Sequence, residues 1–208
     1  MFSESIFRPF DYLKIEWAHG IVSKKVLDLY IPLIIGVLIS ALLCWIAYKF
    51  PGSVQKPLKA NIFDNEITYF MAGFLQTIPG FYIAALAAIS TFSSTTMDED
   101  MVEPAPQKEG GPISRRFFLS QLFAYLSALS LLAYFITIVA RYLSSLDILV
   151  GCPKIVYLTI YFVSTGLYVA IISQLIILTG LGLYYLGDRI HKNNPKTPEV
   201  IDVDDKDK

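Results

Sequence analysis

The chain has 208 residues, of which 54% are hydrophobic and 17% are charged, and its mean hydropathy is +0.53. These values lie above the usual apolar content and below the usual charge of soluble proteins, so they disfavour an ordinary water-soluble domain. The 17 Lys and Arg residues are balanced by 18 Asp and Glu residues. Without a basic excess to neutralise phosphates, direct binding to nucleic acid is not expected.

The segment 1–28 is predicted to be a cytoplasmic or interfacial amphipathic segment. A helix here would carry its apolar side chains on one face, namely Phe10, Leu13, Trp17 and Ile21. Such a helix would lie at the lipid headgroups, and the residues assigned to membrane anchoring are Trp17, Lys24 and Lys25. The favoured interpretation is an elbow that sets the first span, and the alternative is a membrane-surface sensor or docking face.

Four apolar blocks without any charged residue follow along the chain. Each is long enough to cross an apolar core of about 30 Å as a helix, and their ranges are 29–48, 67–90, 117–140 and 155–186. No period-two alternation indicates a β-barrel, which is the other structure that satisfies backbone groups in lipid. The predicted fold is all-α, a four-transmembrane-helix bundle over residues 29–190, followed by a flexible acidic tail over 191–208.

The positions of the basic residues predict the orientation of the bundle. Of the 17 Lys and Arg residues, 12 lie in the N-terminal segment, the loop 91–116 and the C-terminal tail. The positive-inside rule therefore places both termini in the cytoplasm. The loop 91–116 carries several Pro and Gly residues and an acidic run, which predicts an irregular, largely solvated connection.

Small residues recur at four-residue spacing within each span. This spacing places them on one helical face and lets helix backbones approach closely, which is how spans associate in lipid. The residues assigned to helix packing are Gly36, Ser40, Ala84, Ala88, Ser120, Ala124, Gly166 and Ala170. The pattern leaves open whether these faces serve the bundle alone or also a homo-oligomer.

Three glutamines are the strongest polar groups inside the spans. Gln76, Gln121 and Gln174 each need a hydrogen-bond partner, because hydrocarbon offers none. The favoured interpretation is hydrogen bonding between helices. The alternative is that they line a pore in an oligomer.

Two dipeptides have a predicted mechanical role. Pro79 and Gly80 lie near the middle of the second span, where a missing backbone N–H predicts a bend. Arg115 and Arg116 precede the third apolar block, and they are predicted to reach lipid phosphates and to fix the depth of that helix.

Catalytic and metal-ligating patterns are not found in the sequence. His19 and His191 belong to no metal-ligand or nucleophile motif, and the spans carry no carboxylate for ion-coupled transport. The expectation is therefore a protein that is not an enzyme and that needs no metal or cofactor. The acidic tail, with Asp202, Asp204 and Asp205, is the candidate contact for a soluble protein partner.

The run QTIPGFYIAALAAISTF, the short acidic loop and the run SRRFFLSQLFAYLS resemble a family of small bacterial four-span proteins, the membrane component of the Kiwa anti-phage defence system. The resemblance implies a multi-pass protein of the bacterial inner membrane, homo-oligomeric and tetrameric. It also implies a cytoplasmic DNA-binding partner and a response to phage attack at the envelope. The expected function is a non-enzymatic sensor and scaffold that regulates this partner; the alternatives are a pore-forming effector or a structural subunit of a membrane complex.

Overall fold

The structure is a computed structural model that is mostly helical. It describes residues 8–17, 23–49, 61–91, 93, 95–101, 106–108, 111–146, 148 and 152–189. Four helices are long and apolar enough to cross a membrane, over Val26–Lys49, Glu66–Thr91, Arg115–Ser145 and Lys154–Gly187. The prediction of a helical protein with four candidate spans is therefore confirmed. The tail residues Asp202, Asp204 and Asp205, predicted to contact a partner, lie outside the described residues.

Each span extends slightly beyond its uncharged apolar run. The long helices are α2 (Ile31–Lys49), α3 (Glu66–Thr91), α5 (Arg115–Ser145) and α6 (Lys154–Tyr184). A π-helical turn, η2 (Val26–Tyr30), leads into α2, and a second, η4 (Tyr185–Arg189), follows α6. The fourth span is thus helical throughout and ends in this π-helical turn.

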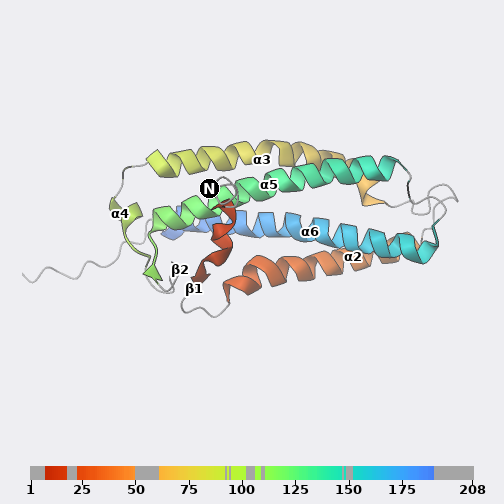
Figure 1. Cartoon of the computed structure of the whole chain (residues 1–208), viewed down its shortest axis with the longest axis horizontal. Coiled ribbons are helices and arrows are strands. Elements are labelled where there is room, and N and C mark those ends of the chain that lie inside the picture. Colours follow the sequence, from red (N-terminus) through yellow and green to blue (C-terminus); the bar gives the residue numbers. More distant parts are fainter. Residues whose placement is uncertain are drawn as a thin grey trace, which may run out of the picture.

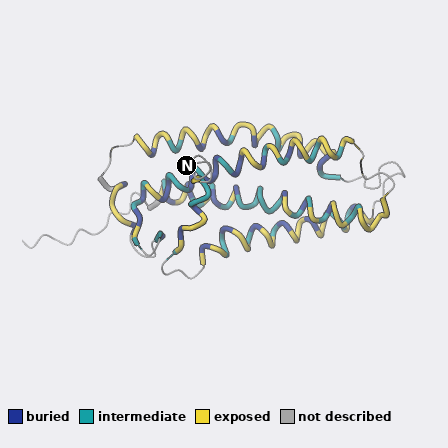
Figure 2. Tube along the Cα trace, viewed as in Figure 1, coloured by how far each residue is buried: buried dark blue, intermediate teal, exposed yellow. Residues whose placement is uncertain are grey.

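The four helices pack in the order α3, α5, α6, α2 rather than in chain order (Figure 1). The closest packing is between α3 and α5 and between α2 and α6, and α5 joins the two pairs by contacting α6. Half of the α5 span is buried, compared with 17–22% in the other three spans. Figure 2 shows the resulting contrast between a buried centre and exposed edges. The third span is therefore the central helix of the bundle.

The main hydrophobic core lies towards the N-terminal end of α5. It combines residues from the spans with residues from the extramembrane segments, including Tyr12, Ile15, Tyr82, Ile89, Met97, Met101, Ile113, Phe118, Leu122, Leu126 and Leu178. The loop 91–116 thus supplies Met97, Met101 and Ile113 to the core. The expectation that this loop is irregular and largely solvated was wrong for these three residues, whereas its acidic residues Asp98, Glu99 and Asp100 are exposed.

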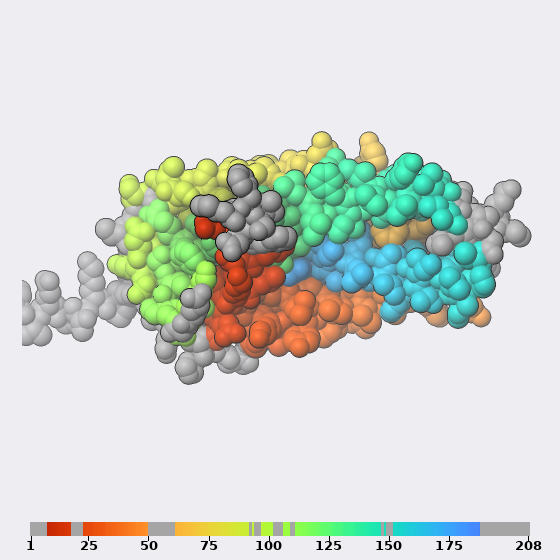
Figure 3. All heavy atoms as spheres, in the orientation of Figure 1, coloured from red at the N-terminus to blue at the C-terminus, as the bar shows by residue number. Residues whose placement is uncertain are grey.

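At this end, the elements outside the four candidate spans form a small cap. We define the cap as η1 (Arg8–Lys14), β1 (Glu16–Trp17), α4 (Thr95–Asp98), β2 (Pro106–Lys108) and β3 (Gly111–Pro112). Its strands form an antiparallel sheet in the order β1-β2-β3. Figure 3 shows η1 and β1 lying across α5 and beside the beginning of α2. The cap therefore joins two segments that are distant in the sequence.

The predicted amphipathic helix is not formed over residues 8–17, which are instead a 3-10 helix followed by a two-residue strand. Residues 24–28 are helical, and Ile21 lies outside the described residues. Tyr12 and Ile15 are buried while Leu13 is exposed, which matches the three-residue repeat of a 3-10 helix rather than the expected α-helical face. The reason is that α5 offers Tyr12 an aromatic surface, and η1 packs on this surface rather than on lipid.

Candidate functional site

A buried ion pair lies where the cap meets the bundle. Lys24 and Asp28 are four residues apart, so they lie on the same face of the turn that leads into α2, and Lys24 Nζ is 2.8 Å from an Asp28 carboxylate oxygen. The two residues are only 4% and 3% exposed. Burial lowers the pKa of Lys24, and the Asp28 carboxylate opposes that shift. A buried charge of this kind depends on its partner, because water cannot replace it.

Tyr12 of the cap completes the surroundings of this ion pair. Lys24 Nζ donates to the Tyr12 backbone carbonyl at 2.9 Å and lies 3.9 Å from the centroid of the Tyr12 ring. The Tyr12 hydroxyl donates to Asp28 at 3.5 Å. Burial raises the pKa of Tyr12, so its hydroxyl stays protonated as a donor. The cap is thereby tied to the first span by several polar contacts.

The same tyrosine connects the cap to the two central helices. Its ring stacks on Tyr125 of α5, with ring centroids 5.2 Å apart and planes inclined by 24°. The Tyr125 hydroxyl in turn accepts a hydrogen bond of 3.0 Å from Gln174 of α6. We call Tyr12, Lys24, Asp28, Tyr125 and Gln174 the polar cluster. It joins η1, the start of the first span, α5 and α6 in one continuous set of contacts.

A second link joins α4 of the cap to the α3–α5 pair. Arg116 binds both carboxylate oxygens of Asp98, with distances of 2.6 and 3.1 Å, and donates to the Ile89 carbonyl near the end of α3 at 2.7 Å. The Arg116 hydrogen bond lowers the pKa of Asp98. This planar two-oxygen geometry is the favourable one for a guanidinium and a carboxylate.

The residues assigned to membrane anchoring mostly have protein surroundings instead. Lys24, assigned to membrane anchoring, and Arg115, predicted to reach lipid phosphates, are both buried; the core and the cap cover both side chains. The Arg116 guanidinium donates to the Asp98 carboxylate and to the Ile89 carbonyl. Trp17 pairs with Pro106 in the cap sheet. Lys25 is exposed, and its anchoring role stays a prediction.

One of the predicted packing faces is confirmed in detail. A Cβ atom on Gly36 of α2 would lie 2.5 Å from the Gly166 carbonyl oxygen of α6 and 3.0 Å from the Ala170 Cβ. The side chain of Ser40 occupies the space above Gly166, where an added Cβ would lie 3.2 Å from Ser40 Oγ. These four small residues let the α2 and α6 backbones approach closely.

The small residues of the second span are oriented differently. Ala84 and Ala88 are exposed, so the prediction that they pack within the bundle was wrong. The face of α3 that turns inward carries Tyr82 and Ile89, because these larger side chains fill the space beside α5. Among the remaining assigned residues, Ser120 and Ala124 are half-buried on α5. A role for the exposed small residues between protein copies stays a prediction.

The three glutamines do not share a common surface in the structure. Gln174 forms the predicted hydrogen bond between helices with Tyr125. Gln121 is half-buried, and its side-chain oxygen has no hydrogen-bond partner among the described residues. Gln76 is exposed on α3. The interpretation as contacts between helices is therefore confirmed for Gln174.

Pro79 lies inside α3, which continues as one helix from Glu66 to Thr91. Pro79 is buried and Gly80 is exposed, with nothing within 4 Å of a Cβ added to Gly80. Proline removes one backbone hydrogen bond at this point of the span. The bend at Pro79 and Gly80 stays a prediction.

The described residues contain no group of three or more His, Cys, Asp and Glu side chains that could hold a metal ion. His19 and His191 lie outside the part of the chain that the structure describes. No protein-family model matches the chain, and the comparisons with curated proteins and with solved structures also give no match. The polar cluster is accordingly the candidate site on its geometry alone.

The sequence carried a signal for part of this cluster. Lys24 and Asp28 have the spacing of an ion pair on one helical turn, and a carboxylate so close to an apolar run indicates a partner. Tyr12 and Tyr125 had no such signal, because a ring stack between residues so far apart in the chain depends on the tertiary packing.

Proposed function

We propose that this chain is a non-enzymatic sensor and scaffold in the inner membrane of a bacterium, belonging to an anti-phage defence system. In this proposal the cap and both termini lie in the cytoplasm, and the protein is a homo-oligomer, a tetramer, that recruits or regulates a soluble DNA-binding effector. The resemblance of the second and third spans to the Kiwa membrane component supports the system. The bias of basic residues towards the cap side supports the orientation.

The observation that carries the proposal is the polar cluster. It connects the cap to the first, third and fourth spans through Lys24, Asp28, Tyr125 and Gln174. A perturbation of the membrane that shifts these helices against one another would change the cap at the same time. Signalling requires two such arrangements with different affinity for the partner.

The buried charges explain why the cap would follow the helices. Moving the cap away would remove the Tyr12 carbonyl that accepts from the buried Lys24 ammonium, and a buried polar group left without its partner costs about 1–3 kcal/mol, more when it is charged. This cost is larger than that of breaking an exposed ion pair. The cap and the start of the first span are therefore expected to move as one unit.

The test is affinity purification of the tagged full-length protein from its native host in mild detergent, followed by identification of bound proteins and mass analysis. We expect a homo-oligomer that carries a soluble DNA-binding protein. Recovery of the oligomer without any soluble partner would overturn the scaffold proposal. Replacement of Asp202, Asp204 and Asp205 by Asn should reduce partner recovery if the tail is the contact.

A paired set of variants tests the role of the polar cluster. Lys24→Met with Asp28→Leu replaces both charges by apolar groups, a change that leaves many buried pairs stable, so the oligomer should persist. Lys25→Met is the matched control, because Lys25 is the exposed neighbour. We expect the double variant alone to abolish phage protection. Unchanged phage protection in the double variant would show that the polar cluster is not required for signalling.

The competing proposal is a pore formed by an oligomer, and the exposed position of Gln76 favours it. An outward-facing glutamine would line a path only where protein copies meet. Liposomes that contain this chain alone would then leak an entrapped dye, and Gln76→Leu would slow the leakage. Intact liposomes together with a recovered partner favour the scaffold.

A further inference from the structure

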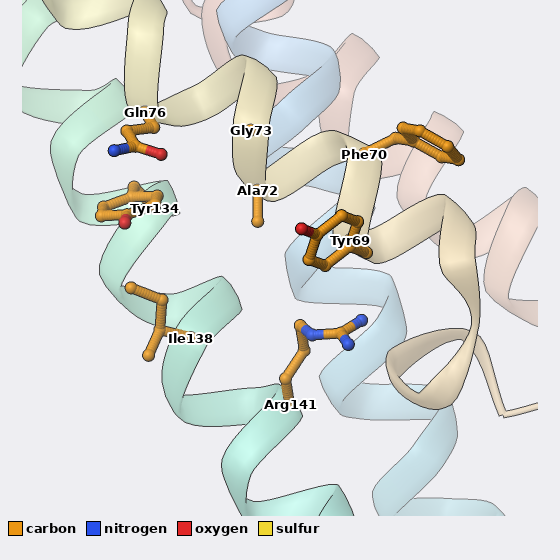
Figure 4. A pocket seen from close by; sticks show the side chains of 8 residues that line it. All are labelled: Tyr69, Phe70, Ala72, Gly73, Gln76, Tyr134, Ile138 and Arg141. Atoms are coloured by element: carbon orange, nitrogen blue, oxygen red, sulfur yellow. The ribbon is translucent and has the colours of Figure 1, made fainter.

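A groove lies between α3 and α5 at the end of the bundle opposite the cap. Its volume is about 410 Å³, and the residues that matter for its chemistry are Tyr69, Gly73, Gln76, Tyr134, Ile138 and Arg141. Figure 4 shows Arg141 reaching up from α5 towards Tyr69, with Gln76 and Tyr134 at the other end of the groove. Tyr69 is 66% exposed, so the groove opens to the outside of the protein.

The guanidinium of Arg141 lies at one end of this groove. Its Nη1 donates to the backbone carbonyls of Phe63 at 3.4 Å and Asn65 at 3.2 Å, and its Cζ lies 5.7 Å from the centroid of the Tyr69 ring. No carboxylate of the described residues forms an ion pair with it. The groove therefore offers a positive charge to an anion.

The depth of Arg141 in the membrane indicates which anion it meets. Arg141 is the first charged residue after the uncharged run 117–140, so it lies where the hydrocarbon core gives way to the headgroups. Arginine at this level extends towards lipid phosphates. The groove is open on the lipid side, and a phosphate at this depth belongs to a phospholipid.

Gln76 provides the second polar contact, deeper in the same groove. It lies seven residues after Tyr69 on α3, which is about 10 Å along a helix. No hydrogen bond joins its side chain to another residue in the described part of the chain. An amide without a partner in hydrocarbon is costly, and the ester carbonyl of a phospholipid bound with its phosphate at Arg141 would supply one.

We propose that this groove binds one phospholipid molecule. The phosphate lies on Arg141 beside the Tyr69 ring, the glycerol crosses Gly73, a glycerol ester accepts a hydrogen bond from Gln76, and one acyl chain continues beyond Gln76 and Tyr134. The site is independent of the proposed sensor function, because it involves neither the cap nor the polar cluster.

Two variants change the groove in different ways. Arg141→Gln removes the charge, although it also alters the contacts with Phe63 and Asn65. Gly73→Leu fills the groove and leaves Arg141 intact, since a Cβ at Gly73 has nothing within 4 Å. The matched controls are Gly80→Leu, which also has open space on α3, and Lys154→Gln, which removes a charge at the same end of the bundle outside the groove.

The measurement is native mass spectrometry of the full-length protein in mild detergent during titration with phosphatidylglycerol. We expect one lipid to bind per protein chain. Arg141→Gln should weaken its binding by roughly tenfold, the factor that corresponds to the loss of one charge-assisted hydrogen bond. Gly73→Leu should weaken it by at least roughly tenfold, because the added side chain occupies the groove. The two controls should bind the lipid as the wild type does.

Two further ligands test which part of the phospholipid the groove recognises. Diacylglycerol has the chains and esters without the phosphate and should bind roughly tenfold more weakly to the wild type, whereas inorganic phosphate should not displace the phospholipid. Displacement by inorganic phosphate would assign the site to a free anion and overturn the proposal. Lipid binding as strong as that of the wild type in both Gly73→Leu and Arg141→Gln would also overturn it. If Gly73→Leu changed the mass of the oligomer but not the binding of lipid, the groove would instead be a contact between protein copies.

Discussion

The two helix pairs of the bundle are held together by opposite kinds of side chain. In the α2–α6 pair, Gly36 and Gly166 bring one backbone against the other. In the α3–α5 pair, large rings and branched side chains fill the space, as where Tyr82 faces Phe123 with ring centroids 6.1 Å apart. A backbone contact has no rotamers with which to adjust, whereas large side chains can repack. The first pair should therefore tolerate added atoms poorly and the second should respond mainly to lost volume.

The largest effect is expected from an added side chain in the α2–α6 pair. Gly36→Leu would force the two helices apart, because even a Cβ would lie 2.5 Å from a backbone oxygen. We expect a loss of about 3 kcal/mol in the free energy of unfolding, measured by thermal or denaturant unfolding in detergent. Gly80→Leu is the control and should change little. Equal losses of unfolding free energy in Gly36→Leu and Gly80→Leu would show that the close α2–α6 contact is no more sensitive to added atoms than an open position on α3.

Loss of volume in the other half of the core should have a smaller effect. Leu126→Ala removes a fully buried side chain of α5, and we expect a loss of about 2 kcal/mol. Leu132→Ala, at an exposed position of the same helix, is the control. The comparison between the pairs fails if Leu126→Ala is more harmful than Gly36→Leu in the same assay.

A single polar contact between spans should contribute less again. Tyr82 of α3 shares a hydrogen bond of 2.5 Å with Thr179 of α6. Tyr82→Phe keeps the ring and removes the hydroxyl, and we expect a loss of about 0.6 kcal/mol, the average for such bonds in membrane proteins. A double-mutant cycle with Thr179→Val isolates the bond. A coupling energy of zero would show that the contact adds no stability.

The smallest effect is expected at the exposed end of the α3–α5 pair. Asp98 has its pKa lowered below the ordinary value of 3.8 by Arg116. The folded-state pKa is thus below that of the unfolded state, so the pair stabilises the protein above pH 3.8 and the contribution disappears as the pH falls through the lower folded value. Solvent screening keeps this contribution small. The wild type and Asp98→Asn should unfold at different temperatures at neutral pH and converge in acid.

The features that sequence alone could predict were those governed by local composition. The four spans follow from uncharged runs, and the contact of Gly36 with Gly166 follows from the need of small residues to pack in lipid. The same rule failed for Ala84 and Ala88, because the larger residues Tyr82 and Ile89 decide which face of α3 turns inward. Periodicity within one helix contains no information about the shape of its neighbour.

The candidate site was harder to predict for a related reason. Lys24 was expected to reach lipid, since a lysine before a span usually does so, and its spacing to Asp28 was the signal for another arrangement. Burial of that pair depends on Tyr12 and on the stack with Tyr125. These contacts join distant parts of the chain, and single-residue propensities cannot reveal them.

The close contact between α2 and α6 has a consequence for the biogenesis of the protein. During synthesis α2 is made before α3 and α5, and α6 is made after them. The small-residue face of α2 therefore has no helix of its own chain to pack on until the last of these spans has entered the membrane. A ribosome that stalls before α6 would leave α2 without its partner, and such nascent chains should be substrates for membrane quality-control proteases.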